Sequence, residues 1–158
     1  MLKQISLLIL CAVAIVLFAT PVHACTSAVV SGKVTLDGRP LLWKNRDTDF
    51  MRNHVDYVKG ERYDFIAVVN SANAYLKEAW MGTNSAGFAL MNTQSYNLVD
   101  VKGDEERGAA NGRVIYRALE VCATVEDFCH FLDTISKPSD IEANFGVIDA
   151  QGGAAMFE

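Results

Sequence analysis

This chain carries a cysteine immediately after a leader sequence, and that junction limits where a folded domain can begin. A basic residue at position 3 precedes an uncharged, apolar run over residues 5–18. Short side chains at Val22 and Ala24 form a signal-peptidase site, and the apolar run is shorter than the ~20 residues that cross a bilayer. We therefore expect residues 1–24 to be a signal peptide, so that Cys25 becomes the first residue of the mature protein.

Two other interpretations of the junction stay open. The apolar run could be retained as a membrane anchor, or Cys25 could be the acylated cysteine of a lipoprotein. A lipoprotein signal favours Leu three residues before the cysteine, where this chain has Val22, and His23 fits such a signal poorly. A tethering cysteine is also followed by a polar linker, whereas residues 27–31 have the pattern of a strand.

The charge of the chain limits its partners. The formal net charge is −5 at pH 7, and loss of the leader, with its single lysine, makes it one unit more negative. An acidic chain is a poor match for nucleic acid or for an anionic membrane surface. Residues 25–158 are long enough for one domain with a hydrophobic core.

The order of the elements predicts an α+β fold. Strand patterns fill the first part of the mature chain, and two of them flank a hairpin turn at residues 36–39. Apolar residues then recur at helical spacing over 114–122, and Thr124 with Asp127 predicts the start of a second helix. The expected strands are 26–31, 40–44, 54–58, 63–70, 79–83, 87–93, 144–149 and 154–157, with an exposed loop at 97–111.

Two cysteines remain beside Cys25 in the mature chain. Cys122 and Cys129 form a disulfide in one interpretation, which an oxidising compartment permits. In the other, which we favour, both are small buried hydrophobic residues. The chain has no Cys-x-x-Cys pair and no His-rich spacing, so the sequence predicts no metal site.

Residues suited to acyl transfer lie at both ends of the first predicted hairpin. Cys25-Thr26-Ser27 opens it, and Asn45-Arg46-Asp47-Thr48-Asp49-Phe50 follows it, with Arg46 and Asp49 three residues apart. This pattern resembles the N-terminal nucleophile (Ntn) amidohydrolases related to choloylglycine hydrolase, acid ceramidase and isopenicillin N acyltransferase. It is most similar to bacterial carcinine hydrolase and isopenicillin N acyltransferase-like proteins. The helix pair followed by residues 144–149 also fits that group.

The resemblance implies a fold and a set of catalytic roles. The fold is the Ntn αββα sandwich, incomplete at its C-terminal end, because residues 25–158 correspond to the N-terminal half of the family's catalytic domain. Cys25 is the expected nucleophile, and its own α-amino group is the expected base. Arg46 would favour the thiolate, Asp49 would hold the amino group, and Asn92 would donate to the oxyanion. Asp47 is a weaker candidate.

The resemblance also implies the reaction. We expect hydrolysis or acyl transfer at the linear amide C–N bond of a small N-acyl compound or peptide, with no metal or organic cofactor. Signal peptidase is the expected partner in maturation, and the mature enzyme is expected in the periplasm or secreted, away from the membrane. The sequence leaves an oligomer open.

Two other functions and one other catalytic mechanism are also compatible with the sequence. The protein could be an exported lipoprotein tethered through Cys25 with a binding role, or an inactive truncated paralogue, since the chain ends within the last predicted strand. A papain-like pair would need His54 or His130 beside Cys25; we expect His130 to be an ordinary core or surface residue. The large aromatic residues expected in the core are Trp43, Phe65, Trp80 and Phe88.

Overall fold

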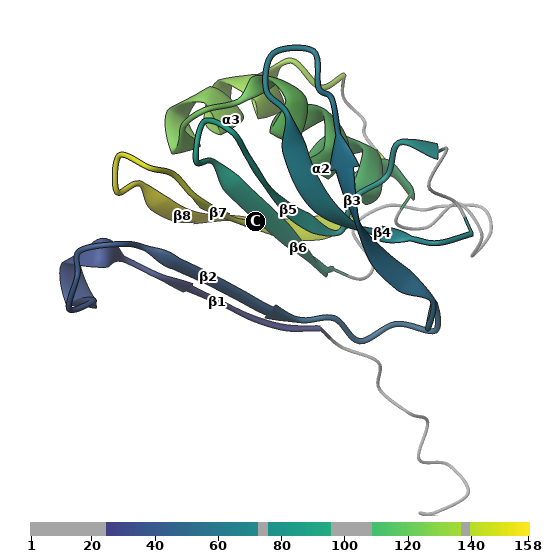
Figure 1. The fold of residues 1–158 in the computed structure, drawn as a ribbon, viewed down its shortest axis with the longest axis horizontal. Helices are drawn as coiled ribbons and strands as arrows, with labels where there is room; N and C mark the ends of the chain where they lie inside the picture. Colours follow the sequence, from purple (N-terminus) through teal and green to yellow (C-terminus); the bar gives the residue numbers. More distant parts are fainter. Residues whose placement is uncertain (1–24, 73–75, 96–108, 137–139) are drawn as a thin grey trace, which may run out of the picture.

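The computed structural model describes residues 25–72, 76–95, 109–136 and 140–158, and these residues form three layers (Figure 1). The predicted signal peptide and most of the predicted loop at 97–111 lie outside the described residues. The first layer is a hairpin of two antiparallel strands, β1 (Thr26–Val30) and β2 (Leu41–Asn45). It lies across one face of a six-stranded sheet, while two helices cover the other face.

The six-stranded sheet is antiparallel throughout, and its strands follow one another in chain order. Its strands are β3 (Asn53–Val58), β4 (Phe65–Asn70), β5 (Met81–Asn84), β6 (Ala89–Gln94), β7 (Ala143–Ile148) and β8 (Ala154–Phe157). The helices α2 (Ala109–Val121) and α3 (Val125–Asp133) join β6 to β7. The α+β prediction and the expected strands agree with this order. The full αββα sandwich stays an expectation from the resemblance.

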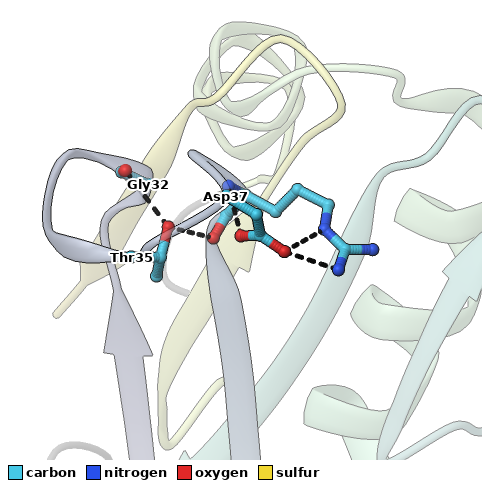
Figure 2. Close-up of polar contacts among 4 residues, drawn as sticks. Gly32, Thr35 and Asp37 are labelled. Carbon is cyan, nitrogen blue, oxygen red and sulfur yellow. Dashed lines mark hydrogen bonds and ion pairs between the residues drawn. The ribbon is translucent and has the colours of Figure 1, made fainter.

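The connection between β1 and β2 is held by its own polar groups (Figure 2). A 3-10 turn at Gly32–Val34 follows β1, and the Thr35 hydroxyl donates to the carbonyl oxygens of Gly32 (3.1 Å) and Arg39 (2.9 Å). Asp37 accepts from the Arg39 backbone and from Arg39 Nε, at 3.1 and 2.7 Å. Gly38 takes φ +74°, which glycine adopts without steric cost. The turn predicted at 36–39 is therefore confirmed.

The core lies between the six-stranded sheet and the two helices. Alternate residues of β4 and β7 point into it, including Phe65, Phe145 and Val147, which are at most 3% exposed. Phe128 on α3 is the centre of an aromatic cluster. Its ring centroid lies 5.2–6.1 Å from those of Phe88, Phe131, Phe145 and Phe157. Such spacing is favourable for aromatic pairs beyond the area that they bury.

Helix α2 begins earlier than the apolar spacing predicts, at Ala109 instead of residue 114. The loop prediction is therefore wrong for residues 109–111. The reason is tertiary: the Asn111 side chain is fully buried and exchanges hydrogen bonds with the Glu142 backbone, donating to its carbonyl and accepting from its N–H, both at 2.9 Å. At Gly112, a Cβ atom would lie 2.9 Å from that of Glu78. The first turn of α2 therefore packs through a polar residue and a glycine, Asn111 and Gly112. The apolar spacing that predicts a helix does not include such residues.

Three expectations about individual side chains are corrected by the structure. Trp43 is 54% exposed, because it lies on the face of β2 that points away from the six-stranded sheet. Cys122 is buried as predicted, but Cys129 is exposed on α3, and neither thiol is in a disulfide. Phe65 and Phe88 are buried as predicted, whereas Trp80 is half-buried and lies beside the site described next.

Candidate active site

A cavity of about 160 Å³ lies where β1 begins and β2 ends. The antiparallel register pairs Thr26 with Asn45, so the hairpin brings Cys25 to the level of Arg46. The six-stranded sheet supplies the opposite wall through Asn92 and Gln94 of β6, an interior strand. The lining residues are Cys25, Lys44, Arg46, Asp47, Thr48, Phe50, Trp80, Asn92 and Gln94.

The Cys25 thiol is half-buried at this cavity. Its Sγ lies 3.7 Å from the backbone carbonyl oxygen of Asp47, to which the S–H donates. A thiol is a weak donor, so this contact orients the sulfur without removing it from reaction.

Arg46 is held by three neighbours. Its guanidinium donates from one terminal nitrogen to Asn70 Oδ1 (2.9 Å) and from the other to Asn53 Oδ1. Its Cζ lies 4.8 Å from the centroid of the Trp80 ring, a cation–π distance. Burial lowers the pKa of Arg46, and the nearby Cys25 partly opposes that shift; an arginine nonetheless stays charged in a protein. The cavity therefore holds a fixed positive charge near the thiol.

Asn92 is 4% exposed and lies on β6. Its Oδ1 accepts a hydrogen bond of 3.0 Å from Lys44 Nζ, which also donates to the Trp80 carbonyl oxygen at 3.0 Å. Burial lowers the pKa of Lys44 from 10.5 to about 8; Cys25 opposes this shift and Arg46 adds to it. Two cations and an amide thus surround the cavity that Cys25 enters.

The structure brings three of the four predicted catalytic residues to one cavity: Cys25, Arg46 and Asn92. Asp49 lies on the exposed segment between β2 and β3, where its backbone carbonyl accepts from the Met51 N–H at 3.0 Å. Its neighbour Asp47, the weaker candidate, is the acidic residue that contributes to the cavity lining.

His54 is exposed on β3, with Nδ1 3.0 Å from the Ser71 hydroxyl, and His130 is exposed on α3. Neither lines the cavity of Cys25 within the described part of the chain.

Three residues of the site were not predicted from the sequence: Lys44, Asn53 and Asn70. A signal for Lys44 was present, because side chains two apart on a strand share a face. Leu42 and Lys44 both point toward the six-stranded sheet, while Leu41, Trp43 and Asn45 are exposed. A lysine on the inner face of a predicted strand is unusual enough to mark it as a candidate.

A larger hollow of about 410 Å³ lies beside the same hairpin, between β2 and residues of the strands β3 to β7. Its walls are almost entirely apolar and include Leu42, Val68 and Met81. None of the residues that line it carries an ionisable or nucleophilic group except the hydroxyl of Thr83. The smaller cavity is therefore the one equipped for chemistry.

Among the residues that the structure describes, no group of three or more His, Cys, Asp or Glu side chains is placed to hold a metal ion. No helix in these ranges has the length and hydropathy needed to cross a membrane.

Comparison with known proteins gives one match. Residues 35–158 match the sequence model of a family described as acyl-coenzyme A:6-aminopenicillanic acid acyl-transferase. The matched range includes Arg46, Asp49 and Asn92 and begins after Cys25 and β1. Neither the curated proteins nor the solved structures contain a match.

Proposed function

This chain belongs to the acyl-coenzyme A:6-aminopenicillanic acid acyltransferase family, and we propose that it is a cysteine amidohydrolase or acyltransferase acting on small linear amides. Membership of the family points to an acyltransferase or hydrolase. One observation carries the finer proposal: the Cys25 thiol shares a cavity with a held guanidinium and a buried amide, those of Arg46 and Asn92.

The proposed reaction begins with cleavage of the signal peptide after Ala24 by signal peptidase. The signal peptide directs export to the periplasm or beyond, and its cleavage gives Cys25 a free α-amino group. Such groups titrate at about 7.7–8.0, so at pH 7 roughly a tenth to a sixth of them are unprotonated and able to act as a base. Asp49 is proposed to accept a hydrogen bond from this amine and hold it near the sulfur. Before cleavage the same nitrogen is a peptide N–H, which cannot take a proton.

In the first chemical step the α-amine takes the thiol proton while Sγ bonds to the amide carbon. The C=O electron pair becomes an oxyanion, and Asn92 Nδ2 is the proposed donor to it. The oxyanion then collapses, the C–N bond breaks, and the leaving nitrogen takes the proton from the α-ammonium group. Attack on the thioester by water completes hydrolysis, and attack by a second amine completes acyl transfer.

Arg46 is proposed to stabilise the thiolate, and it is well placed for this role. Its guanidinium is held by Asn53, Asn70 and the Trp80 ring. A positive charge held in place needs little reorganisation when the sulfur becomes negative. Loss of the Arg46 charge should therefore slow thioester formation more than it weakens substrate binding.

Intact-mass measurement on the exported protein tests the proposal. The expected species begins at Cys25 with a free amine and gains the mass of one acyl group on brief exposure to an N-acyl substrate. Suitable substrates are N-acyl amino acids, β-alanyl amines, bile-salt-like conjugates and N-acyl derivatives of 6-aminopenicillanic acid. Cys25→Ala should gain no acyl mass, and Cys25→Ser should release amine far more slowly.

The same measurement distinguishes the rival functions. A diacylglyceryl mass on Cys25 would identify a tethered lipoprotein and end the enzyme proposal. A folded, correctly processed protein that is acylated by none of these substrates would favour an inactive paralogue.

A further inference from the structure

Lys44 lines the cavity of Cys25, but the mechanism proposed above gives it no role. It lies on β2, two residues before Arg46, and its side chain crosses from the hairpin layer to the six-stranded sheet. There its Nζ donates to two acceptors at 3.0 Å, the carbonyl oxygen of Trp80 and the Oδ1 atom of Asn92. Burying an ammonium group is costly unless it is well hydrogen-bonded, and these two hydrogen bonds tie Lys44 to the layer that carries Asn92.

The hydrogen bond to Asn92 determines which way the Asn92 amide faces. An ammonium group has only donors, while an asparagine amide has an acceptor on one side and two donors on the other. The contact with Lys44 therefore requires Oδ1 on the Lys44 side and Nδ2 on the opposite side. No acceptor among the described residues takes the Nδ2 protons, and Nδ2 is not among the fully buried, unpartnered side-chain atoms of these residues. Nδ2 is thus free to donate within the cavity.

We propose that Lys44 is a positioning residue: by binding Asn92 Oδ1 it presents Asn92 Nδ2 as the oxyanion donor beside Cys25. This inference rests on the proposed function, because it assigns a task within the same reaction. An amide that is already oriented needs no rearrangement when the oxyanion forms, which is the condition under which such donors are most effective. The Trp80 carbonyl holds a second proton of the ammonium group and limits the movement of Nζ.

A different role for Lys44 would be purely electrostatic, since its charge also lies near Cys25 and Arg46. The two roles differ in which reactions they accelerate. A charge that favours the thiolate accelerates attack on every electrophile, whereas an oriented oxyanion donor accelerates only attack on a carbonyl. The ratio of the two kinds of reaction therefore isolates the positioning role.

The experiment measures two rate constants for Cys25 in the exported, processed protein. Iodoacetamide reports attack at a saturated carbon, in which the S–C bond forms as the C–I bond breaks and no oxyanion arises. Acetylation by 4-nitrophenyl acetate passes through an oxyanion before 4-nitrophenolate leaves, and its burst is followed by absorbance. The quantity compared between variants is the acetylation rate divided by the alkylation rate.

We expect Lys44→Met to lower this ratio about 10-fold or more, and Asn92→Ala to lower it by roughly 10²–10³, the usual effect of losing an oxyanion donor. If Lys44 acts through Asn92, the double variant has the same ratio as Asn92→Ala alone. An unchanged ratio in Lys44→Met, or losses that multiply in the double variant, would overturn the proposal.

Circular dichroism shows whether each variant folds. Where Lys44→Met does not fold, Lys44→Gln replaces it, because glutamine keeps an N–H donor for Asn92 without the charge. The ratio of acetylation to alkylation rates in Lys44→Gln should stay within about threefold of the wild-type ratio, even if both rates fall. A 10-fold loss of this ratio would refute the positioning role. All variants carry Cys129→Ser, because the exposed Cys129 thiol would react with both reagents. In this background Cys25→Ala separates the two proposals. A burst that survives this substitution overturns the proposed function and this inference together, whereas a Cys25-dependent burst with an unaltered ratio in Lys44→Met overturns only the inference.

Discussion

Gly146 on β7 sets the spacing between the hairpin that carries Cys25 and the sheet that carries Asn92. A Cβ atom built at this position would lie 2.5 Å from Met91 Cε, 2.9 Å from Val29 Cγ2 and 3.3 Å from Leu42 Cδ1. The Met91 methyl group can move aside, because methionine is flexible. Val29 is β-branched and stiff at χ1, so its contact would have to be relieved by movement of β1.

The structure allows the effect of Gly146→Ala to be estimated. The built Cβ is about 0.5 Å closer to Val29 Cγ2 than the 3.4 Å at which ordinary van der Waals contact begins. Overpacking of this kind costs about 1–3 kcal/mol, and a gain of about 0.4–1 kcal/mol from the stiffer unfolded chain offsets part of that cost. We expect a net loss of about 1–2 kcal/mol in the free energy of unfolding. Because a 1 Å misplacement of reacting groups costs about 10²-fold in rate, we also expect acetylation of Cys25 to slow roughly 10-fold.

Urea unfolding followed by circular dichroism measures the stability, and the 4-nitrophenyl acetate burst measures the rate. The matched variant is Val29→Ala in the Gly146→Ala background, which removes the clashing methyl groups and should restore the rate more than it restores the stability. Gly146→Ala with wild-type rate and stability would refute the reasoning, and so would a failure of Val29→Ala to recover the rate.

Three further predictions concern the thiols, a helix terminus and the pH dependence. Burial raises the pKa of the Cys122 thiol to about 12. Iodoacetamide at pH 7.5 should therefore label Cys129 and leave Cys122 unmodified until urea unfolds the protein. Peptide mass mapping measures the labelling, and a labelled Cys122 in the folded protein would contradict the prediction. Thr124 caps α3 by accepting from the Asp127 N–H at 3.0 Å. Thr124→Ala should therefore lower the free energy of unfolding in urea by about 1 kcal/mol. Thr134→Ala, beyond the other end of α3, is the control and should not lose the stability that the N-cap provides. Lys44 has its pKa lowered from 10.5 to about 8, so between these values the unfolded chain binds more protons, and wild type should gain stability relative to Lys44→Met as pH rises from about 8 to 10.5. If the free energy of unfolding of wild type fell relative to that of Lys44→Met over this pH range, the result would contradict the burial of Lys44.

Much of the fold could be predicted because its elements are local. The strand β4, the Gly38 turn and the Thr124 cap each involve residues that are neighbours in sequence, and the structure has all three. The start of α2 could not be predicted in this way. Asn111 and Gly112 are poor helix formers, and they are helical here because Glu142 and Glu78, distant in the chain, contact them.

The burial of side chains was predicted correctly in strands that have the core on one side. The prediction failed in the two outer layers, the hairpin and the helices, each of which packs against another layer on one face. Trp43 has the size and hydrophobicity of a core residue, yet it lies on the outer face of β2. Cys129 follows the fully buried Phe128 along α3 but points toward solvent. In both cases the residue type is apolar and the position in the layer decides its exposure.

The sequence alone was enough to predict that Cys25 lies near Arg46, because an antiparallel hairpin brings its two open ends together. It also indicated the family, whose sequence model covers Arg46, Asp49 and Asn92. It could not predict that Lys44 donates to Asn92 or that Asn53 and Asn70 accept from Arg46. These contacts join the hairpin layer to the six-stranded sheet. How one layer lies on another depends on the packing of all the side chains between them, which no local pattern along the chain records.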